Sequence, residues 1–243
     1  MGEPADGIRN IVIGTPFGEW RNDRVEGEPR EAAEFYAALL GWQIVRNDWM
    51  KIGTSLEALP HIAFGDGWSD SRPPRWRDPA SPTQAHVDIA VPDIPAALAQ
   101  AGGTTLLEEV DGDHVVLADP LGHPVCLRSG LAADGEPSLS RVVLDCAAGQ
   151  AGEMASFYDA LLADAADGEL LAYQEVDGFV ETTWPDDDYP AQLHLDLQFA
   201  DVDAAVARAE RLGARRLASP RPNARTFADP AGHPICLCTL TGN

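Results

Sequence analysis

The sequence predicts an α+β fold in which two similar units follow one another along the chain. The first observation is a ten-residue segment that occurs twice, at 118–127 and 228–237, with eight identical positions. The second is the order of elements: an apolar strand-like run, a helical run and then short alternating runs, an order that occurs twice in each half. Strands and helices mixed in this order favour a duplicated α+β architecture.

The first half supplies two modules, each with a strand, a helix and further strands. In the first module we expect a strand at 10–14, a helix at 29–40, and strands at 43–47, 50–53 and 61–65. Pro29 suits a first helical turn, and Gly41 suits the residue that follows a helix. In the second module we expect a strand at 86–91, a helix ending at 101, and strands at 105–110, 114–118 and 124–128.

The second half repeats this order. Its segments 156–163, 194–201 and 228–237 correspond to 34–41, 86–93 and 118–127. In both ten-residue segments Asp-Pro-x-Gly fits a tight turn, which makes the two flanking strands antiparallel neighbours. A polar stretch with two Gly and one Pro at 129–138 reads as a linker, so we expect domains at 1–130 and 139–243.

Charge and composition exclude several classes of partner. Asp and Glu outnumber Lys and Arg by 39 to 17, which gives a formal net charge of −22 and argues against nucleic acid. No run approaches the roughly 20 apolar residues that span a bilayer, and the acidic N-terminal segment does not fit a signal peptide. The four cysteines do not form a disulfide framework. We therefore expect a cytoplasmic protein with reduced thiols.

Three motifs carry a resemblance to a known superfamily. They are Glu-Phe-Tyr-x-x-Leu-Leu-Gly at 34–41, His-x-Asp-x-x-Val-x-Asp at 86–93, and the Asp-Pro-x-Gly-His-Pro-x-Cys-Leu segment, and all are echoed in the second half. The sequence resembles the vicinal oxygen chelate superfamily, which includes glyoxalase-like, bleomycin-resistance and extradiol dioxygenase proteins. The resemblance implies tandem glyoxalase-like domains, each of two βαβββ modules that pair into a cupped mixed sheet with the helices outside. It leaves open whether modules pair within one half or across halves.

The same resemblance implies where a metal would be held, on the first and last strands of paired modules. His86 and His194 open the second module of each half, and the last strand has Cys126 and Cys236 where the family commonly has Glu. Two donors do not make a tight site. We therefore expect no metal cofactor, with a divalent metal ion on His86 and Cys126 as the alternative. His61 could add a donor.

The first strand of each half adds one further candidate. Asn10 lies at the matching place in the first half and is expected beside His86 and Cys126 as a neutral side chain. Arg141 lies at that place in the second half and is expected beside the second His and Cys, where its fixed charge would repel a metal or bind an anionic ligand. The simpler interpretation of the histidines and cysteines is burial in the sheet.

Aromatic residues in the crossovers between modules favour a planar ligand. Trp68 and Trp76 flank an Arg-containing loop in the first half, and Trp184 lies in the equivalent loop of the second. Their faces could stack on a ligand at the mouth of a cup, or they could anchor the loops. His123 and His233 follow the turn glycines, and we expect them to be exposed.

The hypothesis for function is therefore a metal-independent small-molecule-binding protein, in resistance to or metabolism of an aromatic natural product. The alternative is a metal-dependent lyase, isomerase or dioxygenase, so the sequence does not decide whether the chain is an enzyme. The catalytic candidates are His86 and His194. The candidate ligand-binding residues are Asn10, Trp68, Trp76, Cys126, Arg141, Trp184 and Cys236. We expect a small-molecule partner, no nucleic acid, no membrane, and a monomer or homodimer.

Overall fold

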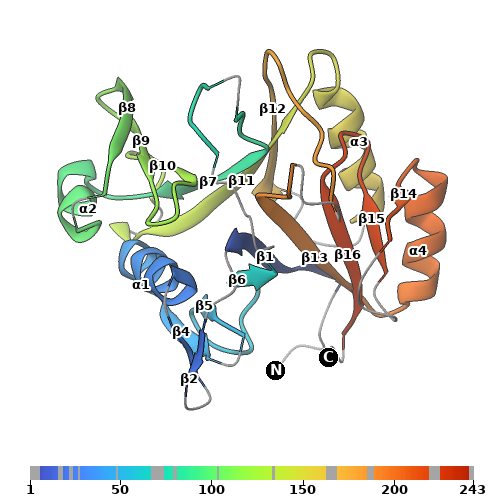
Figure 1. Ribbon diagram of the computed structural model, residues 1–243, viewed down its shortest axis with the longest axis horizontal. Coiled ribbons are helices and arrows are strands. Elements are labelled where there is room, and N and C mark those ends of the chain that lie inside the picture. The colour runs from blue at the N-terminus through green and yellow to red at the C-terminus, as the bar shows by residue number, and fades with distance from the viewer. Residues whose placement is uncertain are drawn as a thin grey trace.

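In the part of the chain that the structure describes, two large β-sheets and four helices make up most of the fold. The computed structural model describes residues 6–15, 19–21, 24–26, 28–47, 49–66, 74–78, 81–102, 104–132, 135–162, 169–184, 189–218 and 225–240. The helices are α1 (Glu28–Leu40), α2 (Ile94–Gln100), α3 (Ala151–Leu161) and α4 (Val202–Arg211). In Figure 1, α1 and α2 lie at one end of the molecule and α3 and α4 at the other.

The larger sheet joins the first module of the chain to the last. From the first half it takes β1 (Gly7–Thr15), β4 (Gln43–Arg46), β5 (Lys51–Gly53) and β6 (His61–Asp66). From the second half it takes β13 (Leu193–Phe199), β14 (Arg215–Arg216), β15 (Thr226–Ala228) and β16 (Pro234–Thr239). The strand order is β14-β15-β16-β13-β1-β6-β5-β4. The junction is the antiparallel pair β1–β13, drawn in blue and orange in Figure 1.

The smaller sheet joins the two middle modules. It contains β7 (Ala85–Ala90), β8 (Leu106–Asp111), β9 (His114–Ala118) and β10 (Pro124–Arg128) from the first half. The second half adds β11 (Ser138–Cys146) and β12 (Leu171–Glu175), and the order is β12-β11-β7-β10-β9-β8. Here the junction is the antiparallel pair β7–β11. A separate hairpin consists of β2 (Glu19–Arg21) and β3 (Arg24–Glu26).

Modules therefore pair across the two halves, which settles the alternative that the sequence leaves open. Each sheet takes one module from each half, the first with the fourth and the second with the third. Within each module the flanking strands run parallel, as in β1–β6 and β7–β10. The last two strands of the ten-residue segment, β9 and β10, are antiparallel as the turn predicts.

One apolar core lies between the sheets and the helices, and it contains residues of all four modules. Side chains alternate along each strand, so Val87 and Ile89 of β7 enter this core while His86 and Asp88 point to the opposite face. The same alternation puts Leu195 and Leu197 of β13 in the core. The opposite faces of the two sheets are the places where polar side chains gather.

The repeated Asp-Pro-x-Gly-His turn is held from inside the protein. Asp119 accepts hydrogen bonds from the backbone N–H groups of Leu121 and His123, and its other oxygen accepts from the Tyr36 hydroxyl at 3.2 Å. Tyr158 donates to Asp229 in the same way at 2.9 Å. The Phe-Tyr motif and the turn therefore meet in both halves, with the tyrosine of the helix bonded to the aspartate of the turn.

This arrangement corrects the expectation that the two turn histidines are exposed. His123 and His233 are both buried, at 9% and 4% exposure. The His233 imidazole contacts Asp229 through Nδ1 at 3.0 Å and the Gln84 carbonyl through Nε2 at 3.1 Å. The nearby carboxylate holds the pKa of His233 above its usual value in spite of burial. Local sequence predicts exposure for a residue that follows a turn glycine. Here each turn is bonded to the tyrosine of a helix and lies beneath that helix.

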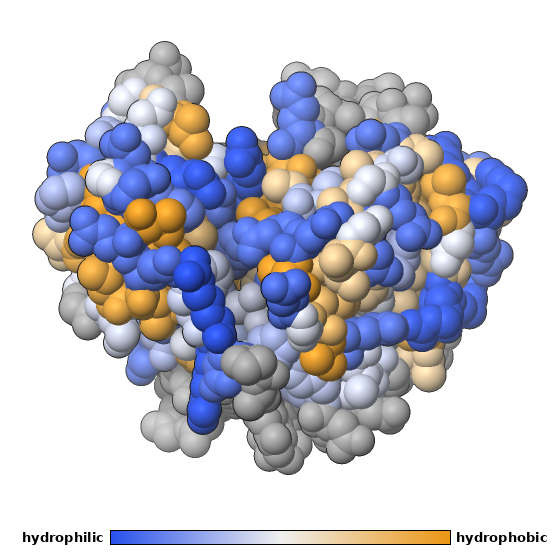
Figure 2. All heavy atoms as spheres, turned by 90° about the horizontal axis from the view of Figure 1, so that it is seen from above, coloured by the Kyte–Doolittle hydropathy of each residue, from blue (hydrophilic) through white to orange (hydrophobic). Residues whose placement is uncertain are grey.

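A helix that spans a membrane must be about 20 residues long and predominantly apolar. Among the described residues no helix is both long enough and apolar enough to cross a bilayer. Figure 2 shows a mostly hydrophilic face on which apolar residues form small, separate patches.

Candidate functional site

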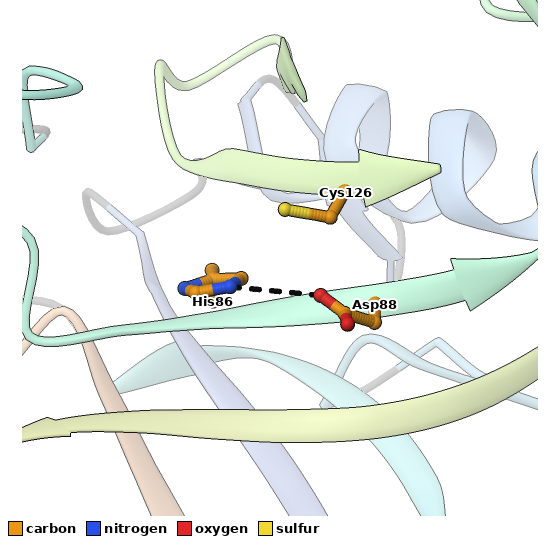
Figure 3. A group of neighbouring side chains, drawn as sticks. All are labelled: His86, Asp88 and Cys126. Carbon is orange, nitrogen blue, oxygen red and sulfur yellow. Dashed lines mark ion pairs between the residues drawn. The ribbon is translucent and has the colours of Figure 1, made fainter. Parts of the chain in front are cut away.

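Three polar side chains converge on the open face of the six-stranded sheet. His86 and Asp88 are two residues apart on β7 and so share a face, and β10 places Cys126 directly beside Asp88. All three are buried, and their ligand atoms lie within 4.8 Å of one another. Figure 3 shows them pointing toward one another from the two neighbouring strands. This His86–Asp88–Cys126 group is the centre of the candidate site.

An arginine neutralises the carboxylate of this group. The Arg128 Nε donates to Asp88 Oδ2 at 2.8 Å, and the Asp88 side chain is only 1% exposed. His86 Nε2 lies 3.5 Å from Asp88 Oδ1. Burial lowers the pKa of His86 to about 4, against the opposing effect of Asp88, so the imidazole is neutral at pH 7. Burial, reinforced by Asp88, raises the pKa of Cys126, so its thiol stays protonated.

A cavity of about 480 Å³ opens beside this group. His86, Cys126 and Arg128 line it from the sheet, together with Trp76 from the crossover loop. The Trp76 indole N–H donates to Glu108 at 2.7 Å, and its ring meets the His86 ring edge to face at 5.9 Å between centroids. The cavity is the size of a small-ligand site and has one aromatic wall held in place.

The remaining walls come from both halves of the chain. Val110 and His114 extend the cavity on the first-half side, and Gln174 and Val176 close it from the second half. Arg77 also lines it and pairs with Glu108 at 2.9 Å. The mixed origin of these walls follows from the β7–β11 junction, so neither repeat could build this cavity alone.

The eight-stranded sheet carries a second, related group. His194 and Asp196 on β13 and Cys236 on β16 offer ligand atoms within 4.8 Å of one another. Asn10 Nδ2 donates to Asp196 Oδ2 at 2.7 Å, and the Lys51 Nζ donates to Asn10 Oδ1 at 3.0 Å. A lysine and an amide thus take the place that Arg128 takes in the smaller sheet.

The cross-pairing of modules changes which predicted residues lie together. Asn10 was expected beside His86 but pairs with Asp196, in the other sheet. Arg141 was expected with the second-half group but pairs with Asp88 on the six-stranded sheet, where it is exposed. Both groupings were wrong for one reason: β1 and β11 pair with strands of the opposite half.

The predicted aromatic residues have different outcomes. Trp76 lines the cavity with His86 and Cys126, as expected of a ligand-binding residue. Trp184 is half-buried and does not line that cavity. Trp68 lies outside the described residues. Whether any of these side chains binds a ligand stays a prediction.

Four residues of these sites were missed from sequence. Asp88 and Asp196 were seen only as part of a repeated motif, although the two-residue spacing from each histidine places both on the same strand face. The same alternation, counted from Cys126, places Arg128 on that face of β10. Lys51 gave a different signal, because it is the sole lysine of the sequence.

The His86–Asp88–Cys126 group fits a divalent metal in its donor chemistry. Imidazole nitrogen, carboxylate oxygen and thiolate sulfur are all zinc ligands. His86 Nδ1 and Asp88 Oδ1 are buried with no hydrogen-bond partner, and Arg128 occupies the other carboxylate oxygen only. Against a metal stands the fixed positive charge of the Arg128 guanidinium. The group can therefore be completed by an ion or by a polar ligand.

The comparisons with known proteins agree with this architecture. Residues 23–128 and 141–238 each match the profile of the glyoxalase-like domain, so the chain belongs to the glyoxalase-like domain family and contains two copies of the domain. This membership confirms the resemblance to the vicinal oxygen chelate superfamily. Among curated proteins, none matches the sequence significantly.

Solved structures show the same fold along nearly the whole chain. Glyoxalase I from Zea mays is similar with a TM-score of 0.64 at 16% identity, over 98% of this chain and 93% of that one. The cppA protein from Streptococcus pneumoniae is similar with a TM-score of 0.52 at 11% identity, over 96% of this chain and 98% of that one. At these identities the likeness concerns the fold.

Proposed function

We propose that the chain binds a small organic molecule with a planar aromatic part in the 480 Å³ cavity of the six-stranded sheet, without requiring a metal. The observation that carries the proposal is the fixed Trp76 wall, which offers a preorganised surface beside the neutral His86 imidazole. Preorganisation reduces the entropic cost of binding. Such a molecule fits a role in resistance to, or metabolism of, an aromatic natural product.

The charges around the cavity support a metal-independent site. Arg128 already balances the Asp88 carboxylate, and the raised pKa of Cys126 leaves a thiol that can donate a weak hydrogen bond. His86 can accept or donate one hydrogen bond to a ligand through Nδ1, which has no other partner. A phenol or an amide of the ligand would complete these groups.

Fluorescence titration tests this proposal. The probe is 1-anilinonaphthalene-8-sulfonate, followed by its displacement with a panel of phenols and aromatic amides. We expect saturable binding that weakens about 10-fold in Trp76→Ala, the effect of losing roughly 1.4 kcal/mol of aromatic contact. Trp184→Ala is the matched control, since Trp184 does not line the cavity, and it should bind as the native chain does. Equal binding by both variants would contradict the proposal.

The second candidate is a metal-dependent lyase, isomerase or dioxygenase, and it is favoured by the two buried atoms without a hydrogen-bond partner, His86 Nδ1 and Asp88 Oδ1. His86, Asp88 and Cys126 would hold the ion, which would supply Lewis-acid polarisation of a substrate oxygen. Metal analysis of protein purified without chelators separates the candidates. Stoichiometric Zn, Mn, Fe or Ni that is lost in His86→Ala but kept in His194→Ala would favour the enzyme.

A further inference from the structure

Two polar side chains stand side by side on the sheet wall of the 480 Å³ cavity. Strands β9 and β10 are antiparallel, and their register places Arg128 directly opposite His114. Residues opposite one another in such a pair project to the same face, with Cβ atoms about 4.5–5.5 Å apart. Both side chains line the cavity, and we call them the Arg128–His114 pair.

Arg128 has donors that no group of the protein uses. A guanidinium has five N–H donors. Within the described residues only Nε is hydrogen-bonded, to Asp88 Oδ2 at 2.8 Å, and the two Nη groups have no such partner. The side chain is 32% exposed and lines the cavity, so the Nη groups are within reach of a bound molecule. Two parallel N–H groups of an arginine match the two oxygens of a carboxylate.

His114 presents an unsatisfied nitrogen on the same wall. Its Nε2 atom is buried and has no hydrogen-bond partner in the described part of the chain. Burial first, and then the charge of Arg128, lower the pKa of His114, although nearby carboxylates oppose them. The imidazole is therefore neutral at pH 7 and can carry its proton on Nε2. A buried polar atom without a partner is costly, so a ligand atom that bonds it would be favoured.

The carboxylates around the cavity are balanced or screened. Of the two that line it, Asp78 pairs with Arg75 at 3.6 Å and Asp177 is exposed to water. Water and salt screen an exposed charge more than a partly buried one. Glu108 pairs with Arg77 at 2.9 Å. The donors on the sheet wall can therefore attract a negatively charged group.

We propose that the Arg128–His114 pair is a carboxylate-binding subsite, so that the ligand of the cavity is an aromatic carboxylic acid in its ionised form. This inference rests on the proposed function and names the chemical class of its ligand. The Nη groups of Arg128 donate to the carboxylate oxygens, His114 Nε2–H donates to one of them, and the ring lies against Trp76. Hydrogen bonds to an ionised acceptor are roughly twice as strong as neutral ones, so the pair prefers a carboxylate to an amide.

Isothermal titration calorimetry with 2-naphthoate and 2-naphthamide tests the proposal on the full-length chain at pH 7. The two probes have the same ring system and differ in the group expected at the pair. We expect naphthoate to bind about 10-fold more tightly, since water at a side chain that is 32% exposed moderates the charge-assisted bonds. Equal affinities, or tighter binding of the amide, would overturn the carboxylate subsite and leave the proposed function standing. Absence of saturable binding by both probes would contradict the two together.

Three variants assign the preference to the pair. In Arg128→Met with Asp88→Asn, which leaves no unpaired charge, the two probes should bind with about equal affinity. His114→Phe keeps a ring but loses the donor, and the preference should fall about 3-fold. Arg211→Met removes an exposed charge of α4 that does not line the cavity, and the full preference should remain.

A preference for naphthoate that survives in the double variant would overturn the proposal, because positive charge elsewhere would then attract the carboxylate. If the double variant does not fold, the comparison of His114→Phe with Arg211→Met decides. An equal preference in those two variants would exclude His114 from the subsite and so contradict the pair as proposed.

Discussion

The Arg128–Asp88 pair allows a quantitative test of the six-stranded site. Replacing Arg128 by Met removes the guanidinium but keeps an apolar stem of similar length, so Asp88 loses its hydrogen bond at 2.8 Å while staying 1% exposed. Stranding one partner of a buried pair costs about 3–5 kcal/mol. The Arg128 side chain is 32% exposed, so water moderates the loss and we expect about 2–3 kcal/mol.

Equilibrium unfolding in urea measures this loss directly. Arg141→Met is the matched control, because Arg141 lies opposite Asp88 on β11 but is exposed, and we expect a change within about 0.5 kcal/mol. In the double variant Arg128→Met with Asp88→Asn, at least half of the loss should return, since no unpaired charge remains. A single-variant loss below about 0.5 kcal/mol would refute the view that Arg128 compensates a buried carboxylate.

Three further predictions follow from other parts of the fold. Tyr158→Phe and Tyr36→Phe should each cost about 1–2 kcal/mol in urea unfolding, because each leaves a buried turn carboxylate one hydrogen bond short. Lowering the pH from 6.5 to 4.5 should reduce the free energy of unfolding of the unaltered chain by about 2 kcal/mol more than that of the His86→Gln variant. The reason is that the pKa of His86 is about 4 in the folded chain, below its value in the unfolded chain. The segments 1–130 and 139–243, proposed as domains, should each fail to fold as monomers and should form a one-to-one complex when mixed.

Tyr36 and Tyr158 make the same hydrogen bond at equivalent places of the repeat, so the two Phe variants test one prediction twice. For the pH prediction only the difference between the two chains counts, since burial raises the pKa of Asp145 to about 6 and its stabilising effect is lost as the pH rises. A folded monomeric half, an equal acid response, or unchanged stability of both Phe variants would each contradict the respective prediction.

Local sequence predicted the elements well where turns and alternation define them. Strands β9 and β10 begin and end where the Asp-Pro-x-Gly turn predicts, and α1 differs by one residue at its start. Strand β1 is longer than expected, and a register shift between Ile8 and Asn10 interrupts the alternation there. The same irregularity recurs in β11 between Leu139 and Arg141.

The site was less predictable because it depends on which strands meet. The apolar faces of β7 and β13 are alike, so sequence gives no reason for β1 to prefer β13. That choice decides whether Asn10 lies near His86 or near Asp196. The place of the Asp88 carboxylate could be predicted from spacing alone. Its pairing with Arg128 also depends on the conformation of the long Arg128 side chain, which the sequence does not give.

The order of module pairing has a consequence for the emerging chain. Strands β7 and β11 are close in sequence, so the six-stranded sheet can begin to form while the ribosome is still making the second half. The β1–β13 junction must wait, since the Asn10–Asp196 hydrogen bond closes a span of 186 residues. The first module therefore keeps the inner edge of β1 open until almost the whole chain exists, and the larger sheet is the last to close.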